Sequence, residues 1–313
     1  MQFARSGRPV RLWGRDAAQL ERIAREGCNQ RYLPDAPFPA TLQAVSDLES
    51  CLRDCTDLLI AVPSHGLRET LTLLQPQLAG GERICWATKG FELLSGKLPH
   101  QVAADVLGDR FPMAVLSGPT FAREVGAGLP TAMTIAANDA AFATDLAAAL
   151  SGDNFRAYTS DDVIGVEVGG AVKNVLAIGA GISDGLGFGA NTRIALINRG
   201  LAEMTRLGVA LGAKQDTFMG LAGMGDLVLT CTDDLSRNRR MGLALASGQS
   251  IEEAQQEIQQ VVEGVLAAKA VREVALELQV EMPICQQIYR ILYEGVPPKD
   301  AVGTLMGRAL RPE

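Results

Sequence analysis

The residue with the clearest chemical potential is Lys173, the only charged residue between Glu167 and Asp184. Apolar residues recur around it at helical spacing and predict a buried helix; they are Val168, Val172, Val175, Leu176 and Ile178. Lysine is almost never fully buried without a partner, and burial favours its neutral form, so Lys173 could act as an acid or base near neutral pH. A packed stem with the ammonium in water is the competing interpretation. The preceding Gly169 and Gly170 are expected to let another backbone or a ligand approach closely.

Asp226 lies in an apolar, glycine-rich stretch at residues 220–227. An unpaired carboxylate would be costly in such a setting, so it needs a donor, and the ammonium of Lys173 would supply one. A helix cap is the alternative role. The sequence alone therefore leaves two roles open for Asp226.

Residues 236–240 read Ser-Arg-Asn-Arg-Arg and bring a hydroxyl, an amide and three guanidinium groups together in an acidic protein. The planar guanidinium group binds phosphate oxygens in bidentate fashion. The cluster therefore predicts a phosphate site, and a solvated charge run is the alternative.

Two further cations follow expected strands. Lys89 comes directly after a strand at residues 84–88, at the carboxyl edge of the sheet, where folds of this kind bind ligands. Arg15 follows a strand at residues 10–13, at the position where a cation favours a 2′-phosphate on the cofactor. For each, a solvent-exposed side chain is the alternative.

Length and composition limit the classes of protein that are compatible with the chain. Its 313 residues predict two domains, because single cores stop growing at about 250 to 300 residues. The net charge of −7 argues against a nucleic acid or an anionic membrane as partner. The sequence has no apolar run of about 18 residues and no signal pattern, so we expect a cytoplasmic protein without a membrane span. Six cysteines without C-x-x-C spacing predict free thiols, and with only two histidines we expect no metal site.

In the first half, short apolar runs alternate with helical patterns, which predicts a doubly wound parallel sheet of the α/β class. The expected strands lie at residues 10–13, 57–62, 84–88, 114–116 and 131–136. Asp16 and Gln19 are expected to cap a helix that ends at Gly27, and Ser46 and Glu49 to open a short one. Strand signals stop after Tyr158. We therefore expect an α/β domain at residues 1–160 and an all-helical domain at residues 161–313.

A doubly wound nucleotide domain opens with a strand and a G-x-G-x-x-G turn, whose glycines let a helix N-terminus approach the pyrophosphate. Neither precedes residue 10, so the strand at residues 10–13 is expected to be the second strand of such a fold. In a 3-2-1 strand order, the missing first strand would lie between residues 10–13 and 57–62. The dinucleotide-binding domain is therefore predicted to be truncated.

Eight motifs together resemble the bacterial NAD(P)-dependent glycerol-3-phosphate dehydrogenases. In chain order they are LWGRD, AVPSH, WATKG, SGPTFAREV, GGAVKN, GLGFGANT, GLAGMGDLVLTCT and SRNRR. The resemblance spans essentially the whole chain. It implies a Rossmann domain followed by a helical domain, and reversible hydride transfer between NADPH or NADH and dihydroxyacetone phosphate to give sn-glycerol 3-phosphate for phospholipid synthesis. A homodimer is a candidate assembly.

The resemblance also implies roles for individual residues, and none of them is a metal ligand. Lys173 in GGAVKN is the general acid/base and a substrate contact. The other implied substrate contacts are Lys89, Gly118, Thr120, Asp226, Ser236, Arg237 and Asn238. Asp226 would then bind a hydroxyl of the substrate or Lys173. The expected cofactor contacts are Arg15, Lys89, Ala122, Arg237, Val261 and Glu263.

Two other functions stay open at this stage. A related dehydrogenase of a 3-hydroxyacid or ketopantoate would share the architecture and the buried lysine, although the phosphate cluster argues against it. A non-catalytic remnant would bind a phosphorylated metabolite or a partner subunit. Because an internal strand and the pyrophosphate turn are expected to be missing, the chain alone is predicted to be poorly soluble or partly unfolded in its first half, and to lack measurable activity.

Overall fold

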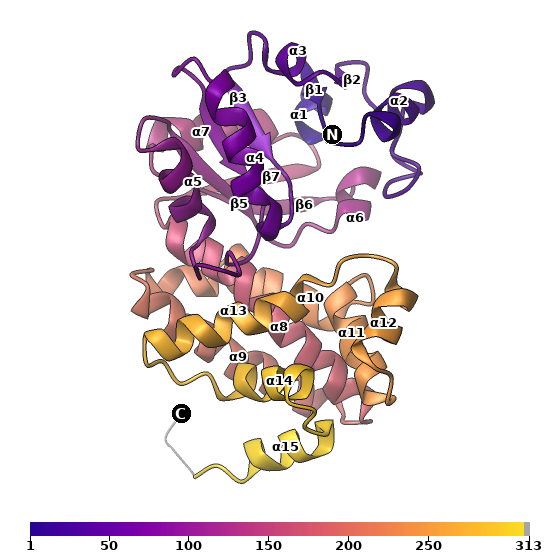
Figure 1. The fold of residues 1–313 in the computed structure, drawn as a ribbon, viewed down its shortest axis with the longest axis vertical. Helices are drawn as coiled ribbons and strands as arrows, with labels where there is room; N and C mark the ends of the chain where they lie inside the picture. The colour runs from indigo at the N-terminus through magenta and orange to yellow at the C-terminus, as the bar shows by residue number, and fades with distance from the viewer. Residues whose placement is uncertain (310–313) are drawn as a thin grey trace.

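The structure, a computed structural model, describes residues 1–309 and divides into an α/β half and a helical half (Figure 1). The α/β half contains two sheets. The smaller sheet pairs β1 (Val10–Leu12) with β2 (Leu42–Ala44), and the larger has the strand order β3-β4-β5-β6-β7. The strands of the larger sheet are β3 (Asp57–Ile60), β4 (Arg83–Trp86), β5 (Met113–Ser117), β6 (Thr131–Ala137) and β7 (Phe155–Ser160).

Most strand pairs are parallel, which confirms the α/β class. Strand β1 runs parallel to β2, β3 to β4, β4 to β5 and β6 to β7. One pair departs from the expected parallel sheet, because β6 runs antiparallel to β5. The segment that joins them holds only the six-residue helix α6 (Ala122–Ala127), which is too short to cross the sheet as the helices of parallel units do.

The smaller and larger sheets are not joined by hydrogen bonds. In residues 1–309, no strand pairs with β1 on the side away from β2, nor with β3 on the side away from β4. This gap lies between the two segments where a 3-2-1 order predicts an internal strand.

The helices of the α/β half begin and end largely where their caps predict. They are α1 (Gln2–Arg5), α2 (Ala17–Glu26), α3 (Leu48–Leu52), α4 (Leu67–Leu74), α5 (Pro99–Leu107), α6 and α7 (Ala140–Leu150). The Asp16 side chain accepts from Gln19 N–H, and Gly27 ends α2 with a left-handed φ of 64°, as expected. Helix α3 is capped by Asp47 and not by Ser46. The short strands β2 and β7 were not expected, since three residues or a mixed polar run carry little signal.

From Val163 onward the described chain forms only helices and turns. The helices are α8 (Val163–Gly185), α9 (Ala190–Ala210), α10 (Asp226–Thr232), α11 (Arg237–Ala246), α12 (Ile251–Ile258), α13 (Glu263–Glu277), α14 (Pro283–Tyr293) and α15 (Pro298–Met306). Helix α8 runs through the centre of this half, and α15 lies farthest from the α/β half (Figure 1).

Helix α8 is long and apolar enough to span a membrane by length and composition, but 89% of that window is buried inside the protein. It is therefore the core helix of the helical half. Its glycines allow close packing: a Cβ at Gly181 would collide with the carbonyl oxygen of Arg239, and one at Gly242 of α11 with that of Ile178. Helices α8 and α11 thus cross in direct backbone contact.

Candidate functional site

Three charged side chains from distant parts of the sequence meet at the junction of the two halves. Lys173 Nζ donates to Asp226 Oδ1 and Lys89 Nζ donates to Asp226 Oδ2, each at 2.7 Å. The exposed fractions of the side chains are 9% for Lys173, 18% for Lys89 and 3% for Asp226. The expectation that Asp226 is paired with Lys173 is confirmed, and the side chain does not act as a helix cap.

Glycines let the three chain segments that hold Lys173, Lys89 and Asp226 approach one another. A Cβ at Gly169 would collide with the carbonyl oxygen of Ala222, in the turn that leads into Asp226. A Cβ at Gly170 would lie 3.3 Å from Cγ of Lys89, whose stem therefore crosses α8 at this point. The expected close approach of another backbone is confirmed at Gly169, whereas at Gly170 the neighbour is a side chain.

The environment adjusts the protonation of Lys173. Burial lowers the pKa of its ammonium, Asp226 opposes that shift and Lys89 adds to it, and the result is a pKa of about 8. Burial alone would raise the pKa of Asp226, but the two ammonium groups outweigh it and hold the pKa below its ordinary value. The site therefore contains a firmly ionised carboxylate and a lysine that can exchange a proton near neutral pH.

Thr230 completes the surroundings of Lys173 and was missed by reasoning from the sequence. Its Oγ1 accepts from Lys173 Nζ at 3.0 Å and donates to the carbonyl oxygen of Asp226 at 2.5 Å. The available signal was its position four residues after Asp226, which places both on one face of α10.

Gly118 and Thr120 lie beside Lys89. The carbonyl oxygen of Gly118 accepts from Lys89 Nζ at 3.3 Å and from Thr120 Oγ1 at 3.2 Å. Gly118 has a φ of 140°, a conformation that favours glycine. These two expected substrate contacts are thus adjacent to the lysine pair, and their contact with substrate stays a prediction.

The structure separates the members of the phosphate cluster. Ser236 caps α11 by accepting from Arg239 N–H at 3.2 Å. Arg239 donates to Asp184 Oδ2 at 2.7 Å and also pairs with Asp234. Arg237 is half-buried and makes no hydrogen bond or ion pair with any residue in 1–309. Arg240 is half-buried too, and its buried Nε has no hydrogen-bond partner in the same residues. The guanidinium groups of Arg237 and Arg240 are therefore the two that are available to an incoming phosphate.

Asn238 links three helices. Its Nδ2 donates to Asn174 Oδ1 at 3.0 Å on α8, and its Oδ1 accepts from Gly264 N–H at 2.9 Å on α13. Asn174 in turn donates to Glu263 Oε2 at 3.5 Å. Asn174 follows Lys173 directly and was also missed. These hydrogen bonds hold α8, α11 and α13 together beside Lys173.

The expected cofactor residues come from both halves of the molecule. Arg15 is exposed and pairs with Glu69 Oε2 of α4 at 3.1 Å. Ala122 is the first residue of α6, and Val261 lies half-exposed in the loop before α13, which begins at Glu263. The structure shows no contact between Arg15 and the lysine cluster in the residues that it describes.

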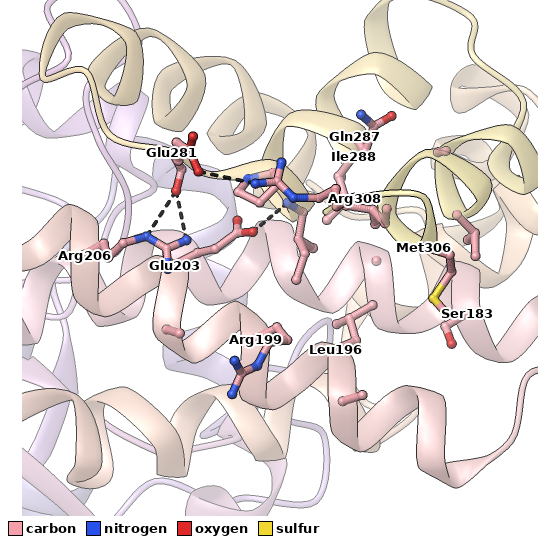
Figure 2. A pocket seen from close by; sticks show the side chains of 18 of the residues that line it. Ser183, Leu196, Arg199, Glu203, Arg206, Glu281, Gln287, Ile288, Met306 and Arg308 are labelled. Atoms are coloured by element: carbon pink, nitrogen blue, oxygen red, sulfur yellow. Dashed lines mark hydrogen bonds and ion pairs between the residues drawn. The ribbon is translucent and has the colours of Figure 1, made fainter. Parts of the chain in front are cut away.

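A cavity of about 1160 Å³ lies elsewhere, between α8, α9, α14 and α15 (Figure 2). None of the expected site residues lines it. The candidate active site is the lysine cluster, because two ammonium groups share one buried carboxylate there. The cavity is also lined by one buried carboxylate, Glu203, whose pKa burial raises to about 6, but its walls are otherwise largely apolar. Residues 1–309 contain no group of three or more His, Cys, Asp or Glu side chains that could hold a metal ion.

A mostly parallel α/β half, joined to a helical half that brings a buried lysine to the edge of the sheet, defines a two-domain nicotinamide-dependent dehydrogenase. The chain belongs to the NAD-dependent glycerol-3-phosphate dehydrogenase family. The family's N-terminal region matches residues 1–143, and its C-terminal region matches residues 162–303.

Individual relatives agree with this assignment. The glycerol-3-phosphate dehydrogenase (NAD(P)+) of Tolumonas auensis is 54% identical over 98% of this chain and 92% of its own length. The enzyme of that name from Sodalis glossinidius is 56% identical over 99% and 92%. The crystal structure of glycerol-3-phosphate dehydrogenase from Coxiella burnetii is 50% identical, with a TM-score of 0.95 over 98% of this chain and 94% of that chain. A ketopantoate reductase from Ralstonia eutropha, 18% identical with a TM-score of 0.58 over 96% and 94%, shares the fold alone.

Proposed function

We propose that this protein catalyses the reversible, NAD(P)H-dependent reduction of dihydroxyacetone phosphate to sn-glycerol 3-phosphate, which supplies glycerophospholipid synthesis. The observation that carries the proposal is the pair of lysines that share one buried carboxylate, Lys173 through Oδ1 and Lys89 through Oδ2 of Asp226. The relatives that match nearly the whole chain are named for this reaction.

Lys173 is the general acid of the proposed reduction. Reduction of the carbonyl carbon leaves negative charge on its oxygen, and a nearby ammonium both stabilises that charge and supplies the proton. A pKa of about 8 keeps Lys173 mostly protonated at pH 7 while making it a stronger acid than an exposed lysine. Asp226 and Thr230 hold the ammonium in place, and in the reverse direction the neutral amine accepts the hydroxyl proton.

Arg237 is proposed to bind the substrate phosphate, with Ser236 and Asn238 beside it. Arg237 is half-buried without a partner in the described chain, whereas Arg239 is held by Asp184. Lys89, next to Gly118 and Thr120, is proposed to contact the substrate from the sheet side. A phosphate at Arg237 and a carbonyl at Lys173 would distinguish this substrate from an unphosphorylated hydroxyacid.

The cofactor is proposed to be NADP or NAD, which supplies the hydride when bound. The residues present fit such a group: the strand ends that receive dinucleotides in parallel sheets lead to Lys89, and Ser117 Oγ at the end of β5 is buried without a hydrogen-bond partner in residues 1–309. Arg15, Ala122, Arg237, Val261 and Glu263 are proposed as further contacts, with Arg15 at the 2′-phosphate.

The proposal is tested by following NADPH consumption with dihydroxyacetone phosphate, dihydroxyacetone, ketopantoate and a 3-oxoacid as parallel substrates. Turnover with dihydroxyacetone phosphate alone supports it. Preference for ketopantoate or the oxoacid would favour a related dehydrogenase. Binding of sn-glycerol 3-phosphate without any turnover would favour a non-catalytic remnant.

The proposal also includes the domain boundary, the cellular location and the oligomeric state. We propose a domain boundary between residues 160 and 161, and the end of β7 at Ser160 and the start of α8 at Val163 support it. A cytoplasmic location is supported by six free cysteines, which suit a reducing compartment. A homodimer is proposed as the assembly, and sedimentation would test it.

A further inference from the structure

A second buried charge connects the two halves of the molecule, away from the lysine pair. Glu167 lies on α8 six residues before Lys173, and none of its side chain is exposed. Trp86 Nε1 donates to its Oε1 at 2.9 Å, and the backbone N–H of His100 donates to the same oxygen at 3.0 Å. His100 Nδ1 lies 2.5 Å from Oε2. All three partners belong to the α/β half.

A carboxylate in this position is costly to bury. Burial raises the pKa of Glu167, and the hydrogen bonds from His100 and Trp86 oppose that shift without cancelling it. An apolar side chain would pack on an apolar helix without this cost. The carboxylate instead makes directional hydrogen bonds, because it accepts from Trp86 at the end of β4 and from the backbone N–H of His100 in the first turn of α5.

The contacts of Glu167 are connected to the lysine site through β4 and α8. Trp86 precedes Lys89 by three residues, so the strand that Glu167 holds leads directly to that lysine. The stem of Lys89 then crosses α8 at Gly170, midway between Glu167 and Lys173. Six helical residues span about 9 Å along the axis. Lys89 and Lys173 then both donate to the carboxylate of Asp226.

We propose that Glu167 is a positioning residue for the proposed reaction, which sets the position of α8 along β4 and thereby the place where Lys173 and Lys89 meet on Asp226. It does not touch the reacting atoms. The inference rests on the proposed function for its kinetic consequence, but the geometry of the lysines can be measured without turnover.

The first test compares Glu167→Ala with Glu203→Ala. Glu203 is also buried in the helical half, and it also accepts two backbone N–H bonds, from Ile284 at 2.6 Å and Cys285 at 3.1 Å, but it lies beside the apolar cavity (Figure 2). Misplacement of reacting groups by about 1 Å can cost about 100-fold in rate. We expect a kcat loss of about that size in Glu167→Ala with little change in the Kd for NADPH, and an unchanged kcat in Glu203→Ala.

Conservative variants separate positioning from bulk stability. Glu167→Gln keeps an oxygen that can accept from Trp86 and from the His100 N–H, so it should restore most of kcat. His100→Ala removes the imidazole Nδ1 that pairs with Glu167 Oε2 and keeps the backbone N–H that binds Oε1. Because the His100 side chain is partly exposed, this variant should fold even if Glu167→Ala does not. We expect a smaller kcat loss in His100→Ala. An unchanged kcat there, or equal losses in Glu167→Ala and Glu203→Ala at matched Tm, would overturn the proposal.

The second test does not depend on turnover. The chain has six lysines, so reductive ¹³C-methylation gives a spectrum in which the Lys173 resonance can be assigned with Lys173→Met and titrated. We expect its midpoint, near 8 in the wild-type protein, to move in Glu167→Ala and to stay in Glu203→Ala. A midpoint that does not move in Glu167→Ala or His100→Ala rejects the positioning role. Wild-type protein without turnover, but with this pattern of midpoints, would reject the proposed function and keep the inference.

Discussion

Replacement of Lys173 by methionine removes the proposed proton donor while keeping an unbranched side chain of similar length. In the structure the ammonium has two partners, Asp226 Oδ1 at 2.7 Å and Thr230 Oγ1 at 3.0 Å, and almost no access to water. Water therefore cannot readily take its place as donor. Loss of a general acid costs about 10²- to 10⁴-fold, and we expect kcat to fall within that range.

The same variant should remain folded. Breaking a buried pair costs about 3 to 5 kcal/mol when it leaves an uncompensated charge. Here Asp226 keeps the ammonium of Lys89 at 2.7 Å, so the loss in free energy of unfolding should lie below that range. Thermal and urea unfolding of both proteins measure it, and m values that agree would show that the same structure unfolds.

The assay is the initial rate of NADPH oxidation with saturating dihydroxyacetone phosphate, measured in a version of the protein that carries a first strand and a G-x-G-x-x-G turn ahead of residue 1, and the matched control is Lys214→Met. Lys214 is an exposed lysine of the helical half that pairs only with Asp161 through its side chain, so kcat should not change. If Lys173→Met kept the wild-type kcat in a folded protein, or if both variants lost activity equally, Lys173 could not be the proton donor.

Three other predictions concern the same site. Because the pKa of Lys173 is about 8 and its ammonium is the acid, kcat for reduction should fall as the pH rises through about 8, and kcat for oxidation should rise; slopes of the same sign would contradict this. Arg237→Ala should raise KM for dihydroxyacetone phosphate by about 10- to 100-fold, since a charge-assisted contact contributes about 1.5 to 3 kcal/mol, and should abolish discrimination against dihydroxyacetone. The control is Arg272→Ala, a partly exposed arginine that pairs with Glu273. Arg15→Asp should lower the NADPH to NADH preference, and an unchanged ratio would leave Arg15 as a surface partner of Glu69.

The sequence by itself determined the class of fold and the residue at the centre of the site. The helix around Lys173 is recognisable because apolar spacing is a local property, and a lone charge in it must be explained. Asp16 and Gly27 mark the ends of α2 for the same reason, since a cap is made by residues three or four positions apart. Asp226 in its glycine-rich stretch also indicated that a donor must be near.

Tertiary structure alone decided which groups are partners. Lys89 lies 137 positions from Asp226 in the chain, and nothing local shows that it takes the second carboxylate oxygen. The five polar residues at 236–240 likewise divide into a cap, an amide bridge between helices, a paired arginine and two half-buried arginines without a partner in residues 1–309. The antiparallel direction of β6 and the link between Glu167 and the α/β half were likewise decided only by the tertiary structure. Spacing encodes which face of an element is buried, whereas hydrogen-bond partners depend on how elements far apart in sequence pack.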